Sequence, residues 1–303
     1  DSLKLVSWNI GYSGLGKDAS FILDGGKGNG KPETREILEG YYEGISKALK
    51  DMDADVYMLQ EVDSGSDRSY KNNQIALLQG DLSKINGAYA NNYVCPFVPF
   101  PIPPIGAVNS GLLTLSDLEF SEATRYALPS PFTWPMSAAN LKRCLLLTRI
   151  PLPDKDAELV VINLHLEAYD DGEGKAAQTD ALLSLLEEEF KKGNYVIAGG
   201  DFNQAFPETT ENFPILDSSF WTPGELGDML LPEGFSYVFD GAAPTCRLLN
   251  APYSGAGSGH QFFVIDGFIV SSNIETVSVL TNDLDFAYSD HNPVVLEVKL
   301  LDS

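Results

Sequence analysis

Residues 197–203, which read IAGGDFN, combine an apolar run, two glycines and two polar side chains. In an extended chain, residues two apart point to the same face, so we expect Asp201 and Asn203 to lie side by side and Phe202 to turn into the core. The glycines indicate a place where another group approaches the backbone closely. A carboxylate that accepts a proton from water, next to an amide that donates to an oxyanion, suits hydrolysis of a phosphate ester. Asp-x-Asn after a strand is also a common turn sequence, so the pair needs support from elsewhere.

Further polar side chains stand at the ends of other apolar segments. They are Asn9, Glu61, His165, Asp266, Asp290 and His291. Plain alternatives exist: Asn9 as a turn residue, Glu61 as a solvated strand end and His165 as a hydrogen-bonded core imidazole. A carboxylate within an apolar strand needs a partner, and a carboxylate commonly orients a histidine. His291 is therefore a candidate partner for Asp266.

The apolar pattern predicts the elements that must position these residues. Strands are expected at 3–10, 55–61, 110–116, 143–149, 159–166, 195–199, 262–270 and 293–300, with 110–116 next to 143–149. Helices are expected at 33–52, with Ile37, Tyr41, Ile45, Ala48 and Leu49 on the buried face, and at 175–192, with Gly193 as its C-cap. No linker divides the chain, so a single domain is expected over residues 1–303.

Four segments rich in glycine or proline predict irregular structure, at 11–30, 95–106, 128–135 and 207–259. The segment 95–106, CPFVPFPIPPIG, has too many prolines for a helix or a central strand. Its Phe97, Phe100 and Ile102 either pack inward, which we favour, or face a ligand. Together with Trp134, this loop could line a pocket or contact a lipid head group.

The composition limits the class of partner. The formal net charge of −23 repels polyanions at long range, which disfavours avid binding of duplex DNA without excluding a nucleic acid held by a few arginines. Cys95, Cys144 and Cys246 are too far apart for a disulfide framework or a zinc site. No apolar run reaches the ~18 residues of a membrane-spanning helix. Because the chain begins at Asp1 rather than Met, we expect an N-terminal segment to have been removed, and we favour a secreted or periplasmic protein.

Six short motifs, in the order SWNI, LQEV, INLHL, GGDFN, IDGFIV and SDHNPV, resemble those of the endonuclease/exonuclease/phosphatase superfamily. Its members include deoxyribonuclease I, abasic-site endonucleases, inositol polyphosphate 5-phosphatases and neutral sphingomyelinases. The motifs extend from Asn9 to Pro293 and so span essentially the whole chain. The resemblance implies the α+β class and a deoxyribonuclease I-like four-layer α/β/β/α sandwich, with two packed mixed sheets flanked by helices. The site would lie at the sandwich edge where the strand ends converge.

The same resemblance implies a metal site. Glu61 would be the Mg²⁺ ligand, with Mn²⁺ as an alternative ion. Asn9 would support the metal or the phosphate, and Asp290 would be a further carboxylate near the metal. Magnesium prefers oxygen ligands and keeps several waters, so one or two carboxylates suffice.

The catalytic residues implied by the resemblance are Asp201, Asn203, His291, Asp266 and His165. Asp201 would position or deprotonate the attacking water, and Asn203 would hold a phosphoryl oxygen. His291 would stabilise the pentacovalent phosphate, with its ring oriented by Asp266. His165 corresponds to the histidine of the deoxyribonuclease-like and sphingomyelinase-like members, where it also contacts substrate.

The substrate is less well determined by sequence. Arg143 is the basic residue expected closest to the phosphate, although a solvated cation is an equal alternative; Arg68 and Arg125 are weaker candidates. Asp24 either closes over the site or is a turn residue, which we favour. We expect a metal-dependent phosphodiesterase or phosphatase acting on a small or lipid-linked substrate by in-line attack of water. A nuclease, and a non-catalytic binding module on the same fold, are the alternatives. The sequence leaves open diesterase against monoesterase activity, one metal or two, and the oligomeric state.

Overall fold

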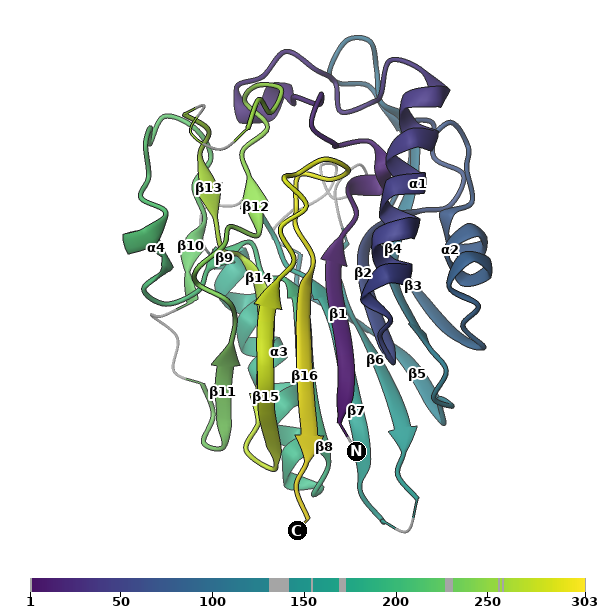
Figure 1. Cartoon of the computed structure of the whole chain (residues 1–303), viewed down its shortest axis with the longest axis vertical. Coiled ribbons are helices and arrows are strands. Elements are labelled where there is room, and N and C mark those ends of the chain that lie inside the picture. Colours follow the sequence, from purple (N-terminus) through teal and green to yellow (C-terminus); the bar gives the residue numbers. More distant parts are fainter. Residues whose placement is uncertain are drawn as a thin grey trace.

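Two mixed β-sheets face each other in the computed structural model, which describes residues 2–130, 142–153, 155–168, 173–226, 231–255, 257 and 259–302 (Figure 1). In spatial order, the first sheet consists of β15 (Ile274–Thr281), β16 (Val294–Leu300), β1 (Leu3–Asn9), β2 (Val56–Asp63), β4 (Gly106–Ser116) and β3 (Asn86–Val98). The second sheet consists of β11 (Phe235–Val238), β14 (Asp266–Ser271), β8 (Tyr195–Asp201), β7 (Glu158–His165), β6 (Cys144–Pro151) and β5 (Glu122–Ala127).

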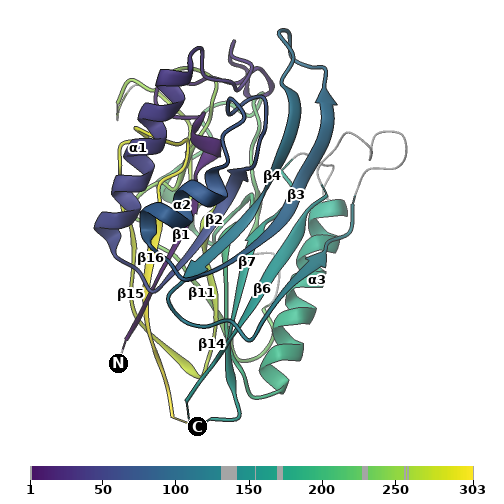
Figure 2. The same ribbon diagram turned by 90° about the vertical axis from the view of Figure 1, so that its right-hand side faces the viewer.

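Helices cover the outer faces of the sheets, as Figure 2 shows. Helices α1 (Arg35–Met52) and α2 (Gln74–Leu82) pack on the first sheet, and α3 (Glu173–Lys191) packs on the second. A separate apolar cluster fills the space between the sheets, where Leu5 and Met58 meet Val161 and Phe268. The predicted four-layer sandwich is therefore confirmed, and the single domain over residues 1–303 stays a prediction.

The start of α1 illustrates how the local sequence sets these elements. Thr34 is the N-cap, and its side-chain oxygen accepts a hydrogen bond from the backbone N–H of Ile37. Tyr41, Ile45 and the neighbouring apolar residues are buried as expected, but Ile37 is exposed and Leu38 takes the buried position. The apolar face is thus displaced by one residue at its first turn.

Two β-α-β units explain why the polar strand ends converge. Strands β1 and β2 are parallel and joined through α1, and β7 and β8 are parallel and joined through α3. Parallel neighbours end at the same edge of a sheet. The strands β16 and β14 run antiparallel to β1 and β8, so the residues at their amino ends reach that same edge. Asn9, Glu61, His165 and Asp201 accordingly lie close to Asp266 and His291.

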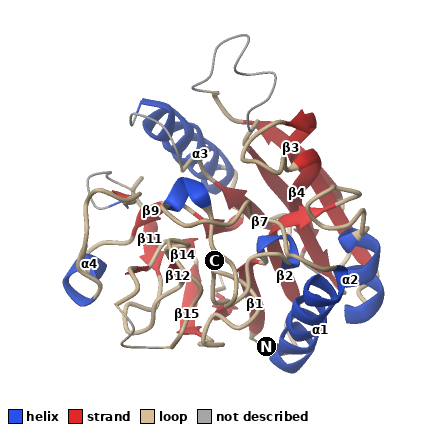
Figure 3. Ribbon diagram, turned by 90° about the horizontal axis from the view of Figure 1, so that it is seen from above, coloured by secondary structure: helices blue, strands red, loops and turns tan. Residues whose placement is uncertain are grey.

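The remaining elements are short. They are α4 (Thr209–Asn212), β9 (Gln204–Ala205), β10 (Gly224–Glu225), β12 (Cys246–Arg247), β13 (Phe262–Phe263) and the 3₁₀ turns η1 (Gly11–Ser13) and η2 (Ile22–Asp24). Figure 3 shows loops and short elements gathered at the end of the sandwich where the polar strand ends meet. The three cysteines are buried and unpaired. In the part of the chain that the structure describes, no helix has the length and apolarity needed to cross a membrane.

Several expected elements are wrong in detail. The segments 110–116 and 143–149 are not adjacent strands of one sheet, because β4 lies in the first sheet and β6 in the second; Leu112 and Leu146 instead meet in an apolar cluster between the sheets. The expected loop at 95–106 begins as the last part of β3, which tolerates Pro96 because it is an edge strand. The expected strand at 262–270 is divided into β13 and β14, and β11 and β12 lie within the expected irregular segment 207–259. The pattern also missed α2, β3, β5 and β15.

Candidate active site

A pocket of about 760 Å³ opens at the edge where the strand ends meet. All residues predicted for the site line it except Asp266, which lies behind His291; the lining members are Asn9, Glu61, Arg143, His165, Asp201, Asn203, Asp290 and His291. The fold therefore brings together every predicted site residue, from both sheets.

Asp201 is the last residue of β8 and lies at the centre of these polar side chains, which form the floor of the pocket. Its Oδ2 atom accepts a hydrogen bond from Nδ2 of Asn9 at 3.0 Å and lies 3.3 Å from Nε2 of His165. Nε2 of His291 is 3.7 Å from the same oxygen. Burial, followed by the charge of Asp266, raises the pKa of Asp201 to about 6. Such a carboxylate can accept a proton from water more readily than an ordinary aspartate.

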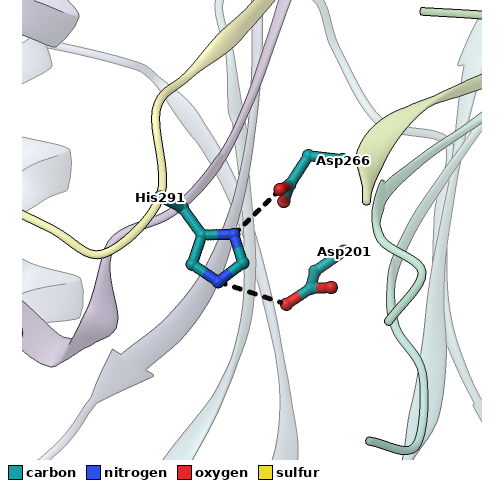
Figure 4. Close-up of side chains that lie close together, drawn as sticks. All are labelled: Asp201, Asp266 and His291. Carbon is teal, nitrogen blue, oxygen red and sulfur yellow. Dashed lines mark hydrogen bonds and ion pairs between the residues drawn. The ribbon is translucent and has the colours of Figure 1, made fainter. Parts of the chain in front are cut away.

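His291 is oriented by Asp266, as Figure 4 shows. Its Nδ1 atom lies 2.8 Å from Oδ2 of Asp266, on the first residue of β14. Burial alone would lower the pKa of His291, but the carboxylates of Asp266 and Asp201 raise it well above 6.5. The ring is therefore protonated at neutral pH, and its Nε2–H group faces the same side of the pocket as Asp201.

His165 has the opposite character. Burial lowers its pKa well below 6.5, and the positive charges of Arg143 and His291 act in the same direction. The ring is neutral at neutral pH, and its Nδ1 has no hydrogen-bond partner among the described residues. The two histidines beside Asp201 thus differ in charge, so one suits stabilisation of an anion and the other suits neutral hydrogen bonding.

Asn9 and Glu61 line the pocket beside Asp201. The side-chain oxygen of Asn9 accepts from the backbone N–H of Gly11 at 3.0 Å, which turns Nδ2 towards Asp201 and Glu61. Glu61 lies where the register of β2 against β4 shifts, and it has a left-handed backbone with φ of 53°. Such strain in a non-glycine residue occurs preferentially at functional sites. The bulge directs the Glu61 carboxylate into the pocket instead of continuing the strand alternation.

Asp290 adds a further carboxylate to the lining of the pocket. Burial raises its pKa to about 7, and the negative charges of Glu61 and Asp24 contribute, while His291 opposes the shift. Carboxylates held close together in a buried place repel each other, and a cation between them would remove that penalty. Oxygen donors of this kind fit a hard divalent cation such as Mg²⁺.

Asn203 reaches the pocket by a turn and not by an extended chain. Its backbone N–H donates to Oδ1 of Asp201 at 2.9 Å, and its φ is 51°. One hydrogen of Nδ2 is used on the backbone oxygen of Leu166 at 2.8 Å, which leaves the second for a ligand. The extended geometry expected for this pair is wrong, although both side chains line the pocket and Phe202 is fully buried as predicted.

The glycines before Asp201 are needed because other parts of the protein, and not a ligand, approach them closely. A Cβ atom on Gly200 would lie 1.9 Å from the backbone oxygen of Leu164, on the neighbouring strand β7. On Gly199 it would lie 2.3 Å from the ring of Phe268. These two contacts set the position of the last residues of β8, and with it that of Asp201.

Two of the three arginines considered from sequence lie at the pocket. Arg143 is buried there, with Nε 3.7 Å from Oε2 of Glu167, so it is not a solvated cation. Arg68 binds Asp63 through two hydrogen bonds of 3.0 and 3.1 Å, and its guanidinium lies 3.6 Å from the centre of the Tyr12 ring. Both cations are held in place before any ligand enters.

Arg125 lies instead on the exposed strand β5, where it donates to the backbone oxygens of Asn91 and Lys142. Asp24, which we expected to be a turn residue, does end the turn η2, but its buried side chain also lines the pocket. Its position depends on the fold of residues 11–30 and has no local sequence signal.

Two residues at or next to the site were not predicted from the sequence, Arg247 and Ser289. Arg247 is fully buried and holds the segment 11–30 through backbone oxygens, including that of Gly16 at 2.9 Å. The hydroxyl of Ser289 donates to the backbone oxygen of Asn9 at 2.8 Å and accepts from the backbone N–H of His291 at 3.2 Å. Ser289 lies in the recognised SDH motif, so its proximity to the site offered a signal; Arg247, in an irregular segment, offered none.

Apolar side chains form the upper walls of the pocket. They include Leu15, Phe21, Leu23, Val98, Phe100, Ile105 and Trp221. The preference for inward packing in the segment 95–106 is wrong, because Phe97, Phe100 and Ile102 are 58%, 53% and 89% exposed. Trp134, which was considered for the same role, lies outside the described residues.

The chain is similar to known proteins in sequence pattern and in fold. The model of the Endonuclease/Exonuclease/phosphatase family matches residues 6–291. No curated protein matches the sequence. Among solved structures, an endonuclease/exonuclease/phosphatase from Beutenbergia cavernae is 20% identical, with a TM-score of 0.69, over 99% of this chain and 72% of its own.

Two further structures share the fold at similar distance. ANGEL2, a 2′,3′-cyclic phosphatase solved with adenosine-2′,3′-vanadate, is 17% identical, with a TM-score of 0.60, over 99% of this chain and 96% of its own. D. rerio TDP2, solved with a single-strand DNA product, is 15% identical, with a TM-score of 0.60, over 99% of each chain. At these identities the likeness is one of fold, and it agrees with the two-sheet sandwich described above.

Proposed function

Because the chain belongs to the endonuclease/exonuclease/phosphatase family and has the fold of a metal-dependent phosphoester hydrolase, we propose that it is a Mg²⁺-dependent phosphodiesterase or phosphatase that acts on a small or lipid-linked substrate. The observation that carries this proposal is the arrangement around Asp201, whose Oδ2 atom is shared by Asn9, His165 and His291 on the floor of one pocket.

Glu61 and Asp290 are the residues that would hold Mg²⁺ or Mn²⁺, with Asn9 in support. The raised pKa of Asp290, to which the negative charge of Glu61 contributes, supports this choice. Asp201, Asp266 and His291 also place ligand atoms within 4.8 Å of one another. However, Nδ1 of His291 and Oδ2 of Asp266 are already joined by a hydrogen bond, so we assign these residues to catalysis. The bound cation would neutralise charge on the phosphoryl group.

The protein groups would divide the remaining chemistry. Asp201 would take the proton of the attacking water, which its pKa of about 6 favours. The protonated His291 would donate to a phosphoryl oxygen on which charge develops, and Asp266 would fix the imidazolium. The free hydrogen of the Asn203 amide would serve a second oxygen. His165 would bind a substrate oxygen as a neutral ring, and Arg143 would supply positive charge at the wall.

The walls of the pocket indicate the kind of alcohol in the ester. The floor is polar and the upper part is apolar, which suits a phosphate attached to an apolar group. A polyanionic duplex would meet a protein of net charge −23. An endonuclease or exonuclease acting on nucleic acid is the second candidate, supported by the DNA product in the D. rerio TDP2 structure.

A substrate panel with Mg²⁺ and with chelator tests these proposals. It would contain a chromogenic phosphodiester, a phosphomonoester, an inositol phosphate, sphingomyelin and plasmid DNA, each assayed with wild type and with Asp201→Asn. We expect cleavage of at least one small or lipid ester that needs Mg²⁺ and Asp201. Cleavage of DNA alone would favour the nuclease, and no Mg²⁺-dependent cleavage of any ester would overturn the proposal.

A further inference from the structure

Exposed apolar side chains lie at the mouth of the pocket and in the sequence next to residues that line it. Among the residues that the structure describes, these are Ile22, Leu23, Phe97, Phe100 and Ile102, which we call the apolar rim. Leu23 is 55% exposed, and Ile102 is 89% exposed. Single exposed apolar residues are ordinary, but several together around a cavity indicate a surface that binds something.

The fold builds the apolar rim from two distant segments. Ile22 and Leu23 belong to the turn η2, and the other members lie at the tip of the hairpin of β3 and β4. The side-chain amide of Asn29 donates to the backbone oxygen of Pro103 at 3.2 Å and so links the two segments. In Figure 2 this hairpin extends beyond the rest of the first sheet, at the end of the molecule opposite the two termini. Phe97, Phe100 and Ile102 thus lie at an end of the molecule that a flat surface can approach.

The apolar rim continues into the pocket. Leu23 and Phe100 are exposed and also line the cavity. Below them, apolar walls lead to the floor that carries Asp201 and His291. An amphiphile could therefore place its phosphate on the floor and its apolar chain along the walls, with the chain leaving the pocket between rim side chains.

Charge decides which surface would be suitable. No member of the apolar rim is charged, and the protein carries a net charge of −23. An anionic membrane would repel this protein, because its surface potential is negative and attracts basic segments. A surface of zwitterionic lipids has no such penalty, and insertion of aromatic and aliphatic side chains into its interface is favourable.

We propose that the apolar rim docks the protein on a bilayer of net-neutral phospholipid, from which the pocket takes its substrate. This inference rests on the proposed function for the identity of the reaction, but the docking itself does not depend on catalysis. It assigns the exposed loop at 95–106 to binding of the lipid surface, and the pocket floor to the phosphate.

Vesicle binding by the full chain tests the proposal. Wild type, Phe97→Ser/Ile102→Ser and the matched control Ile85→Ser/Leu301→Ser would be floated with phosphatidylcholine vesicles. The control removes two exposed apolar side chains at the opposite end, next to the first residue of β3 and the last of β16. We expect the rim variant to lose at least about tenfold in partition coefficient, since one large apolar side chain alone contributes about that factor. The control should bind as wild type does.

Three further measurements separate the explanations. Hydrolysis of a soluble chromogenic diester should be unchanged in the rim variant, because Phe97 and Ile102 are not among the residues that line the pocket. Asp201→Asn should bind vesicles as wild type does. Wild type that binds vesicles but hydrolyses no ester with Mg²⁺ would refute the proposed function and leave docking intact. Vesicles with added phosphatidylserine should bind less protein. Equal binding by the rim variant and wild type would overturn the proposal, as would a rim-dependent change in sedimentation without vesicle binding, which would identify a self-association surface.

Discussion

The imidazole of His291 lies between two carboxylates at unequal distances: Nδ1 is 2.8 Å from Oδ2 of Asp266, and Nε2 is 3.7 Å from Oδ2 of Asp201. The shorter contact is a hydrogen bond that fixes the ring, whereas the longer one leaves room for adjustment when a ligand enters. Asp266 thus orients the imidazole and helps to keep it protonated, and Asp201 lies beside the ring in the pocket.

Asp266→Asn removes the charge that maintains the His291 imidazolium. We expect kcat to fall roughly 10–100-fold, as for other residues that orient a catalytic histidine, with a much smaller change in KM. Steady-state kinetics on a chromogenic diester with Mg²⁺ would measure the two constants separately. A change in KM alone, or a loss that parallels global unfolding, would show that Asp266 has no role in positioning His291.

Asn203→Ala removes the amide that we expect to contact a phosphoryl oxygen. The rate should fall on the order of 100-fold or more, as for loss of one donor to a developing oxyanion. Asn212→Ala is a matched control, because Asn212 is an exposed asparagine whose amide also donates to a backbone oxygen, that of Gly241 at 3.0 Å. Full activity of folded Asn203→Ala protein would mean that the phosphate binds elsewhere.

Glu61→Gln should weaken binding of the divalent ion. A ligand that binds only the folded state raises its stability, so Mg²⁺ should raise the melting temperature of wild type and have little effect on this variant. Without metal, the variant should be at least as stable as wild type, because Glu61 repels Asp290. Titration of Mg²⁺ in a thermal unfolding assay would show both effects. Glu119→Gln, at an exposed position, is the control, and equal shifts for all three proteins would exclude Glu61 as a ligand.

Arg247→Ala should destabilise the protein. The two Nη atoms of Arg247 contact the backbone oxygens of Gly16, Ala19, Leu248 and Ala251 at 2.9 to 3.5 Å. Loss of these buried contacts should lower the free energy of unfolding by about 3 kcal/mol or more. Urea unfolding measures the change.

Arg35→Ala is the comparison for this experiment, since the Arg35 side chain is half exposed and its ion pair with Glu39 is 3.8 Å long. Its effect should stay within about 1 kcal/mol. Similar losses for both variants would show that the contacts of Arg247 add nothing to the stability of segment 11–30.

The pair of Glu189 and Arg149 predicts a pH effect on stability. Burial raises the pKa of Glu189, but hydrogen bonds from Arg149, Lys192 and Asn194 outweigh it and lower the pKa from 4.5 to about 2. Since the folded-state pKa is the lower one, this stabilisation is complete above pH 4.5 and is lost as the pH falls towards 2. Its size is on the order of 3 kcal/mol.

Glu189→Gln should therefore differ most from wild type at pH 6 and progressively less towards pH 2, as measured by urea unfolding. Glu188→Gln removes the neighbouring exposed carboxylate, which also pairs with Lys192, and should show no such trend. A difference between Glu189→Gln and wild type that stays constant with pH would mean that the Glu189 charge is not stabilised by folding.

The sequence by itself determined the layered fold and the identity of the residues on the pocket floor. Apolar periodicity marks the strands that end at Asn9, His165 and Asp201, because burial on both faces leaves a continuous apolar run. Parallel neighbours then bring those ends to one edge. The need of the buried Asp266 carboxylate for a partner also suggested its pairing with His291, which the structure shows at hydrogen-bond distance.

Only the tertiary structure decided the rest of the site. Edge strands such as β3 and β5 escape the pattern because their faces are partly solvated, and β3 also tolerates Pro96. Arg247 and Asp24 reach the pocket through the two-residue strand β12 and the turn η2, whose positions depend on contacts between distant residues such as that of the Arg247 side chain with Gly16. The outward position of Phe97 and Ile102 could not be predicted from their apolar side chains. Burial of any apolar side chain gains free energy, but only the packing of the whole chain decides which side chains are buried.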